Sequence, residues 1–155
     1  MTIAPTLAKY LDQKVLYDTI PHEATSSSMR TAEACHISGD SVAKGVLLRR
    51  NGEYLLAVLP ASHRIRLPEL RSQLGDGIDL ANENEIAQVF SDCARGAIPP
   101  VGECYGLEVI VDESIERQPE IYLEGGDHEV LIHMSGAQFA TLTAGTARGR
   151  FSTHA

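Results

Sequence analysis

Hydrophobic residues between Ser41 and Pro60 form two runs that flank the polar segment Arg50-Asn51-Gly52-Glu53. Asn-Gly between two such runs predicts a β-hairpin with a type I′ turn, because this turn needs positive φ at both central residues. The first run is apolar on both sides, which is typical of a strand covered on both faces. Val42, Val46 and Leu48 fall on one face, and Ala43, Gly45 and Leu47 on the other.

Lys44 interrupts the first run, on the face of Val42 and Val46. A buried ammonium is costly unless its tip reaches water, a carboxylate or an anionic ligand. Two interpretations follow from the sequence. Lys44 is either a lysine at a strand edge whose head group reaches solvent, or a lysine that lines a pocket for an anionic ligand.

Helical spacing and capping residues predict five helices. Hydroxyl side chains at 25–28 precede one of them, and two others open with capping boxes formed by Asn82 with Glu85 and by Ser135 with Gln138. The predicted helices cover residues 6–13, 29–36 and 67–74, and begin after residues 82 and 135.

Apolar and β-branched runs predict further strands at 15–22, 107–111, 120–124 and 128–134, whereas 61–66 is a polar, basic connection. The order of elements is neither a series of βαβ units nor all-β. It predicts an α+β fold, a single domain with a mixed β-sheet surrounded by helices, which we place at residues 1–143. The Gly-, Ala-, Thr- and Arg-rich segment 144–155 is expected to be a flexible C-terminal tail.

Composition narrows the class of protein. Of 155 residues, 43% are hydrophobic and 22% charged, as in a soluble globular domain. No apolar run approaches the length of a membrane span, and no signal peptide is visible. Three cysteines without close spacing favour a reducing compartment over a disulfide framework. We therefore expect a cytoplasmic protein with no membrane partner.

The charge is unevenly distributed. The formal net charge is −8, which argues against broad nucleic-acid binding. Residues 44–71, however, carry six basic and two acidic side chains, a charge of +4, and the rest of the chain carries −12. A local basic face can hold the end of a polyanion without wrapping it. The alternative is that these hairpin tips and loops are simply charged.

Several kinds of site find no support in the sequence. The six histidines lack His-x-x-x-His spacing, and only His36 has a cysteine beside it. The side chains of Cys35 and His36 are adjacent and diverge on a helix, so we expect no metal site. There is no Gly-x-Ser-x-Gly elbow and no Gly-rich phosphate loop. No pattern specifies a Cys–His nucleophile pair, and no cofactor is expected.

The segment 96–102, Gly-Ala-Ile-Pro-Pro-Val-Gly, is a second unusual stretch. Two prolines fix its backbone and remove two N–H donors. The segment is either a rigid loop whose remaining backbone groups point in set directions or a plain tight turn.

Four segments together resemble the YbaK/EbsC family, freestanding relatives of the editing domain inserted in bacterial prolyl-tRNA synthetases. They are A-K-G-V-L-L at 43–48, L-L-A-V-L-P-A at 55–61, G-A-I-P-P-V-G at 96–102 and G-D-H-E-V-L-I-H-M-S-G-A-Q-F at 126–139. The resemblance spans most of the chain. It implies an editing-domain fold with a partly barrel-like sheet, and a trans-editing hydrolase that cleaves the ester between a wrong amino acid and the tRNA 3′ ribose.

The resemblance also implies roles for individual residues. Lys44 aligns with the family's strand lysine, which is thought to engage the terminal adenosine or its phosphates. Gly96 and Pro100 match the Gly-x-x-x-Pro loop that is associated with positioning the aminoacyl group, and we assign these three residues as catalytic. The expected substrate-binding residues are His22, Thr25, Ser28, Met29, Ile98, Pro99, Asp127, His128 and Ser135. The expected tRNA approach surface consists of Arg49, Arg50, Arg64 and Arg66.

The implied reaction needs no nucleophilic triad. An aminoacyl ester is already activated and has a vicinal ribose hydroxyl beside it, so the protein has to orient a water and stabilise the oxyanion, each worth about a few kcal/mol. The implied partners are aminoacyl-tRNA and an aminoacyl-tRNA synthetase. Two alternatives stay open. One is a non-catalytic module that binds tRNA or a synthetase, and the other is a small-molecule domain, which the net charge of −8 favours.

Overall fold

The computed structural model describes residues 2–155. Its helices are α1 (Pro5–Lys14), α2 (Ser28–Ala34), α3 (Leu67–Leu74), α4 (Glu83–Val89), α5 (Glu113–Glu116) and α6 (Gly136–Leu142), with 3₁₀ turns η1 (Gly39–Ser41) and η2 (Glu103–Tyr105). Its strands are β1 (Asp18–Pro21), β2 (Val42–Arg50), β3 (Glu53–Pro60), β4 (His63–Ile65), β5 (Ile78–Leu80), β6 (Glu108–Asp112), β7 (Glu120–Glu124), β8 (Val130–Ser135), β9 (Ala147–Gly149) and β10 (Ser152–His154).

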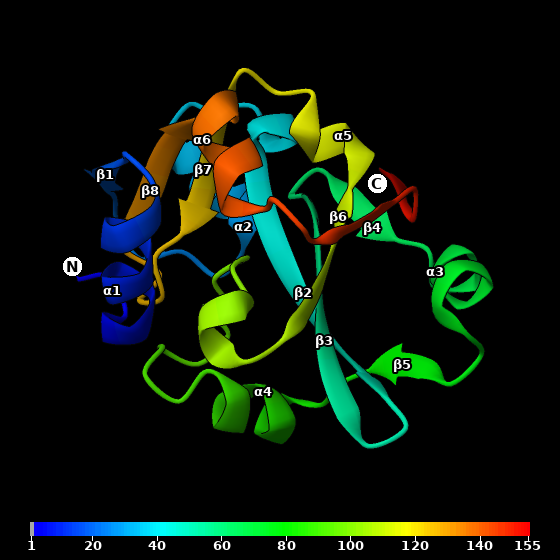
Figure 1. Ribbon diagram of the computed structural model, residues 1–155. Coiled ribbons are helices and arrows are strands. Elements are labelled where there is room, and N and C mark those ends of the chain that lie inside the picture. The colour runs from blue at the N-terminus through cyan, green and yellow to red at the C-terminus, as the bar shows by residue number, and fades with distance from the viewer. Residues whose placement is uncertain (1) are drawn as a thin grey trace.

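Eight strands form one sheet in the order β1-β8-β7-β2-β3-β6-β9, with β5 added to β2 (Figure 1). β2 with β7, β3 with β6 and β6 with β9 are parallel pairs, and the other pairs are antiparallel. β4 and β10 form a separate two-stranded pair, which we call the C-terminal ribbon. A mixed sheet with helices around it confirms the predicted α+β class.

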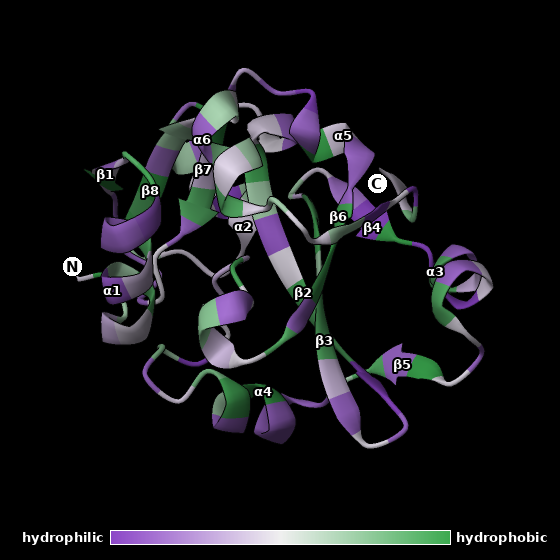
Figure 2. Ribbon diagram, in the orientation of Figure 1, coloured by the Kyte–Doolittle hydropathy of each residue, from purple (hydrophilic) through white to green (hydrophobic). Residues whose placement is uncertain are grey.

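The central hairpin is confirmed. Asn51 and Gly52 have φ of 52° and 82°, and β2 pairs with β3 from Ala43 opposite Pro60 to Arg50 opposite Glu53. Alternate residues of both strands enter two different hydrophobic clusters, so the hairpin is buried on both faces as its pattern predicts. Figure 2 shows this hydrophobic character continuing along β3.

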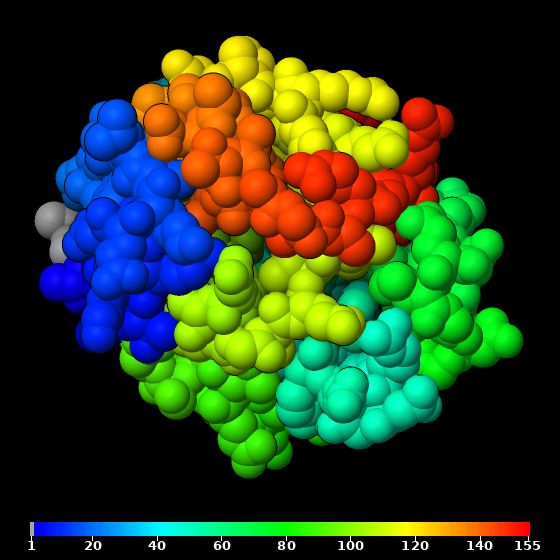
Figure 3. Space-filling model, viewed as in Figure 1, coloured from blue at the N-terminus to red at the C-terminus, as the bar shows by residue number. Residues whose placement is uncertain are grey.

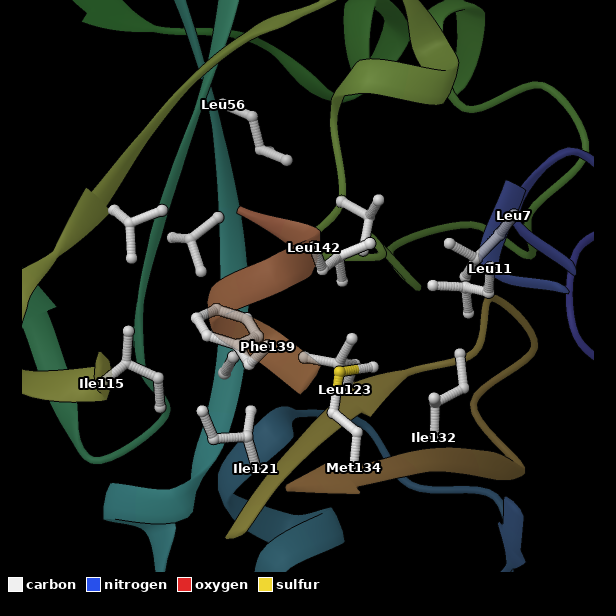
Figure 4. Close-up of a cluster of buried hydrophobic side chains, with 14 of the residues drawn as sticks. Leu7, Leu11, Leu56, Ile115, Ile121, Leu123, Ile132, Met134, Phe139 and Leu142 are labelled. Atoms are coloured by element: carbon white, nitrogen blue, oxygen red, sulfur yellow. The ribbon is translucent and has the colours of Figure 1, made fainter. Parts of the chain in front are cut away.

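The larger cluster lies between the sheet and helices α1, α5 and α6. Figure 4 shows Phe139 of α6 at its centre, beside side chains from β7 and β8. Phe139 is 1% exposed. At about 25 cal/mol per Å² of apolar area, burying such rings gives the fold a stable frame on which loops can be held in place.

All five predicted helices are present. Asn82 and Glu85 make the predicted capping box. Ser135 accepts from the Gln138 N–H, but the Gln138 side chain does not complete a box, because its Oε1 accepts from the Leu16 N–H at 3.0 Å. The segment 61–66, predicted as a connection, contains β4, and the short elements β5 and α5 were not predicted.

The C-terminal segment requires a correction. It is not a flexible tail in the structure, because β9 pairs with β6 and β10 pairs with β4. Phe151, between these strands, is 0% exposed and belongs to the second cluster. Its N–H donates to Asp112 Oδ2 at 2.9 Å. Figure 3 shows the last residues lying against the body of the molecule. Within residues 2–155, none of the helices is long and apolar enough to cross a bilayer.

Candidate functional site

The candidate site lies at a gap along one edge of β2. On this edge, β7 pairs with Val42 and Ala43, and β5 pairs with residues 48–50. Between them, residues 44–46 have no partner strand within the described chain. The gap leaves room for side chains and a loop to approach the centre of the sheet.

A cavity of about 270 Å³ opens at this gap. Its walls come from α2, β2, the residue after β3, the loop before η2 and the β7–β8 connection. The lining residues are Ser27, Ser28, Met29, Lys44, Gly45, Ala61, Gly96, Ile98, Glu124 and His128. Five separate chain segments therefore meet at one cavity.

The Lys44 ammonium is held by backbone oxygens. Nζ donates to the carbonyl of His63 at 2.5 Å and to that of Ala61 at 3.4 Å. Burial lowers the pKa of Lys44. An ammonium has three N–H donors, and the third finds no acceptor among residues 2–155. Lys44 thus lines the cavity with a donor still available for a ligand.

The loop from Arg95 to Pro100 forms the opposite wall. Gly96 has φ of 79°, a conformation that side-chain-bearing residues rarely adopt. The N–H groups of Gly96 and Ile98 make no hydrogen bond within the described chain, and Pro99 and Pro100 have no N–H to donate. Two backbone donors therefore remain available on this loop.

Close packing fixes the position of this loop against β2. A Cβ at Gly45 would lie 3.1 Å from Ile98 Cγ2, 3.1 Å from Leu56 Cδ1 and 3.3 Å from Pro100 Cα. These distances are shorter than ordinary carbon contacts. Only a glycine at position 45 lets the loop approach the gap this closely.

His128 and Glu124 form the third wall. His128 has φ of 65°, and its Nε2 donates to the Arg95 carbonyl at 2.7 Å, because a carbonyl can only accept. Glu124 Oε2 accepts from the N–H groups of Gly126 at 2.8 Å and His128 at 3.3 Å. The His128–Arg95 bond joins the β7–β8 connection to the loop of Gly96, and the two Glu124 bonds hold the connection itself in place.

Helix α2 supplies the remaining wall. The Ser27 hydroxyl caps the helix by accepting from the Arg30 N–H, as the hydroxyl cluster predicts. Met29 is 38% exposed. Its Sδ lies only 2.5 Å from the place where a Cβ on Gly39 would stand. Met29 thus covers η1 and borders the cavity.

Comparison with known proteins identifies the family. Residues 22–142 match the aminoacyl-tRNA editing domain. The chain belongs to this family. The match confirms the resemblance to the YbaK/EbsC group. No curated protein matches the sequence significantly.

Solved structures share the fold of this editing domain. A protein described as a candidate trans-editing enzyme for prolyl-tRNA synthetase has a TM-score of 0.83 and 20% identity, over 97% of this chain and 96% of its own. A protein described as hypothetical gives 0.84 and 18%, over 96% and 99%. A candidate signal-transduction protein from Marinobacter aquaeolei gives 0.76 and 20%, over 96% of this chain but 30% of its own.

Six of the predicted site residues of this editing domain line the cavity: Lys44, Gly96, Ile98, Ser28, Met29 and His128. Pro100, the last residue of this loop, is buried and does not line the cavity, and its Cα lies 3.3 Å from the place where a Cβ on Gly45 would stand. Pro99 is also buried and is not part of the lining. The roles assigned to all these residues stay predictions.

Four other predicted substrate-binding residues do not line the cavity. Thr25 Oγ1 hydrogen-bonds to Thr31 Oγ1 at 2.5 Å. The Asp127 carboxylate accepts from the backbone N–H groups of Thr2 and Glu129. Ser135 caps α6. His22 follows β1, and its Nε2 is buried without a hydrogen-bond partner among the described residues.

The four arginines predicted as an approach surface do not border the cavity. Arg49 pairs with Glu85 at 3.3 Å and Arg50 with Glu108 at 3.0 Å. Both lie five or six positions beyond Lys44 on β2, or about 16–20 Å along a strand. Arg66 pairs with Glu69, and Arg64 lies on the C-terminal ribbon. The basic residues of segment 44–71 are therefore divided between two regions, and ion pairs neutralise part of their charge.

Sequence reasoning missed Ser27, Gly45, Ala61 and Glu124 as lining residues. Glu124 shows the reason most clearly. The parallel register places Val42 beside Tyr122 and Ala43 beside Leu123, so the next pair in this register is Lys44 and Glu124. That neighbourhood depends on which strands pair, and no local pattern in the sequence specifies it.

Proposed function

We propose that this editing domain is a trans-acting aminoacyl-tRNA deacylase. It hydrolyses the ester that joins a wrong amino acid to the 3′ ribose of tRNA, and releases the amino acid and free tRNA. The attacking nucleophile is water, assisted by the vicinal ribose hydroxyl of the substrate. The observation that carries the proposal is the cavity at the β2 gap, where an ammonium and two backbone N–H groups have donors available.

Lys44 is suited to hold the anionic end of the substrate. Its ammonium is anchored by the His63 and Ala61 carbonyls, so the charge is held in place before the substrate arrives. A charged donor makes stronger hydrogen bonds than a neutral one. Its third N–H is available for a phosphate or ribose oxygen.

The backbone of the loop is suited to stabilise the oxyanion. The N–H groups of Gly96 and Ile98 have no partner among residues 2–155, and preorganised donors can lower a barrier by about 3–4 kcal/mol each. Hydrolysis then needs no nucleophilic side chain, because the ester is already activated.

The size of the cavity supports a small acyl group. A volume of 270 Å³ equals that of about nine water molecules in the liquid, at about 30 Å³ each. Such a space suits a small aminoacyl group with its ribose. Discrimination by one methylene is worth about 1–3 kcal/mol, so Met29 and Ile98, which border the cavity, are placed to set which amino acid fits.

The substrate defines the partners and the place of action. Mischarged aminoacyl-tRNA is the substrate, and the synthetase that attaches the wrong amino acid to the tRNA is a second partner. Both occur where translation occurs, so we propose a cytoplasmic protein that acts without a cofactor.

The test is deacylation of Ala, Cys, Ser, Thr and Pro esters of tRNA by the wild type, by Lys44→Ala and by Lys14→Ala. Lys14 is an exposed lysine on α1 and serves as the matched control. We expect multiple turnover on one or two esters by the wild type and Lys14→Ala, and a loss of about 100-fold or more in Lys44→Ala. Circular dichroism checks that Lys44→Ala is folded.

Three outcomes would count against the proposal or a part of it. Retained turnover in folded Lys44→Ala removes Lys44 from the mechanism. Tight tRNA binding without turnover on any ester identifies a non-catalytic module. If the protein neither binds tRNA nor hydrolyses any of the esters, tRNA is not its ligand.

A further inference from the structure

A second group of functional side chains lies outside the cavity. Asp40 of η1, His63 of β4 and His154 of β10 each offer one ligand atom, and these atoms all lie within 4.8 Å of one another. His63 and His154 are directly opposite in the register of the C-terminal ribbon, and their ring centroids are 4.3 Å apart. No step of the proposed deacylation uses this group.

Hydrogen bonds fix the ring of His63. Its Nδ1 lies 2.8 Å from Ser152 Oγ, so the serine hydroxyl holds the ring in place. A serine hydroxyl can accept a hydrogen bond, and the proposal below takes Nδ1–H of His63 as the donor to Ser152 Oγ. The neutral ring of His63 then carries its lone pair on Nε2. Metal-bound histidines commonly show this arrangement, in which the other ring nitrogen donates to an oriented partner.

The other two side chains are also held in place. Asp40 Oδ1 accepts a short hydrogen bond from the Ser62 hydroxyl and lies 2.9 Å from His154 Nε2. In a tetrahedral zinc site with bonds of about 2.0–2.1 Å, ligand atoms are about 3.3 Å apart. Small side-chain rotations therefore bring the three atoms to coordination distances.

We propose that Asp40, His63 and His154 bind a divalent transition-metal ion, for which Zn²⁺ is the probe. Two imidazoles and one carboxylate suit such ions and not Ca²⁺ or Mg²⁺, which prefer oxygen ligands. The side chains of Asp40 and His154 are 42% and 68% exposed, so an ion can reach the site and keep a solvent ligand. Sequence spacing gives no sign of this site, because its ligands come from three separate segments.

The bound ion would act as a clamp. It would join η1 to both strands of the C-terminal ribbon, and β4 contains the His63 carbonyl that holds Lys44 at 2.5 Å. The ion would therefore stabilise the anchor of Lys44 without touching the cavity. This inference does not depend on the reaction that the cavity performs.

The test uses the whole chain, freed of metal with a chelator and titrated with Zn²⁺ by calorimetry. We expect one Zn²⁺ per chain, and a higher melting temperature with Zn²⁺ than without it. Replacement of Zn²⁺ by Co²⁺ should give visible absorption of the intensity typical of four- or five-coordinate Co²⁺.

His154→Ala is the main variant because His154 is exposed and its loss should not unfold the chain. It should abolish saturable binding and the thermal shift. Ser152→Ala, which removes the partner of His63, should weaken binding by about 10- to 100-fold. His133→Ala is the control, because His133 contacts the carboxylates of Asp18 and Glu120 on another part of the sheet. Absence of saturable Zn²⁺ binding, unchanged binding in His154→Ala, or its loss in His133→Ala would overturn the proposal.

Discussion

Lys44 Nζ donates a hydrogen bond to the backbone carbonyl of His63 at 2.5 Å. The two residues belong to different strands, β2 of the central sheet and β4 of the C-terminal ribbon. The hydrogen bond therefore links the lysine at the cavity to a ribbon that is completed by the last residues described. It also explains how an apolar strand tolerates an ammonium, because backbone carbonyls replace part of its hydration.

The titration of Lys44 can test this environment. Burial lowers its pKa from the ordinary value of 10.5, so we expect a midpoint below 10.5 in an NMR titration of ¹³C-labelled lysine. The chain has only three lysines, Lys9, Lys14 and Lys44, and the signal missing in Lys44→Met identifies Lys44. A midpoint at or above 10.5 would contradict the buried position.

The same shift predicts a dependence of stability on pH. Between the folded pKa of Lys44 and its higher unfolded value, the unfolded chain binds more protons, so the Lys44 contribution to stability rises with pH. In urea unfolding, the wild type should gain stability relative to Lys44→Met as pH rises through this window. A relative loss would mean that the folded state favours the charged form.

Gly45→Ala should displace the loop of Gly96. The added Cβ would meet Ile98, Leu56 and the backbone of Pro100 at 3.1–3.3 Å, and overpacking of this kind costs about 1–3 kcal/mol. We expect lower stability in urea and reduced deacylation. Gly77→Ala is the control, because its Cβ meets only the Asn51 side chain within 4 Å. Equal losses in both variants would remove any special role for Gly45.

Gly96→Ala tests backbone conformation separately from crowding. The nearest atoms to its Cβ belong to the His128 ring at 3.8 Å, an ordinary contact, but φ of 79° should cost about 1–2 kcal/mol. Gly106→Ala has a similar φ of 73° with nothing within 4 Å. We expect similar losses of stability in urea and a loss of turnover in Gly96→Ala alone. Equal turnover in the two variants would separate this loop from catalysis.

Local chemistry explains which parts of the fold could be predicted. The Asn51-Gly52 turn and the Asn82–Glu85 capping box depend on residues within four positions of one another, and both are present. Lys44 was found because a charged residue in a buried strand conflicts with its surroundings. Such conflicts are visible in a single segment and often mark a site.

Features that depend on strand order could not be predicted. Glu124 reaches the cavity because β7 pairs with β2, and β9 forms because β6 offers it a free edge. The charge of +4 counted over residues 44–71 was misleading for a related reason. The carboxylates that pair with Arg49 and Arg50 are Glu85 and Glu108, which lie 36 and 58 positions away. A count of charge over a window cannot include such partners.

Phe151 decides whether the C-terminal segment belongs to the folded domain. Its ring is 0% exposed, and its carbonyl accepts from the Arg66 N–H at 2.6 Å, so Phe151→Ala should lower the free energy of unfolding by about 3–5 kcal/mol. Arg150→Ala is the neighbouring control, because its ion pair with Glu113 is largely exposed and such pairs add little to stability. Urea unfolding measures both, and hydrogen exchange at Arg66 should accelerate only in Phe151→Ala. Equal, small effects would mean that the segment is not held in the fold, and the anchor of Lys44 would then lose its support from the ribbon.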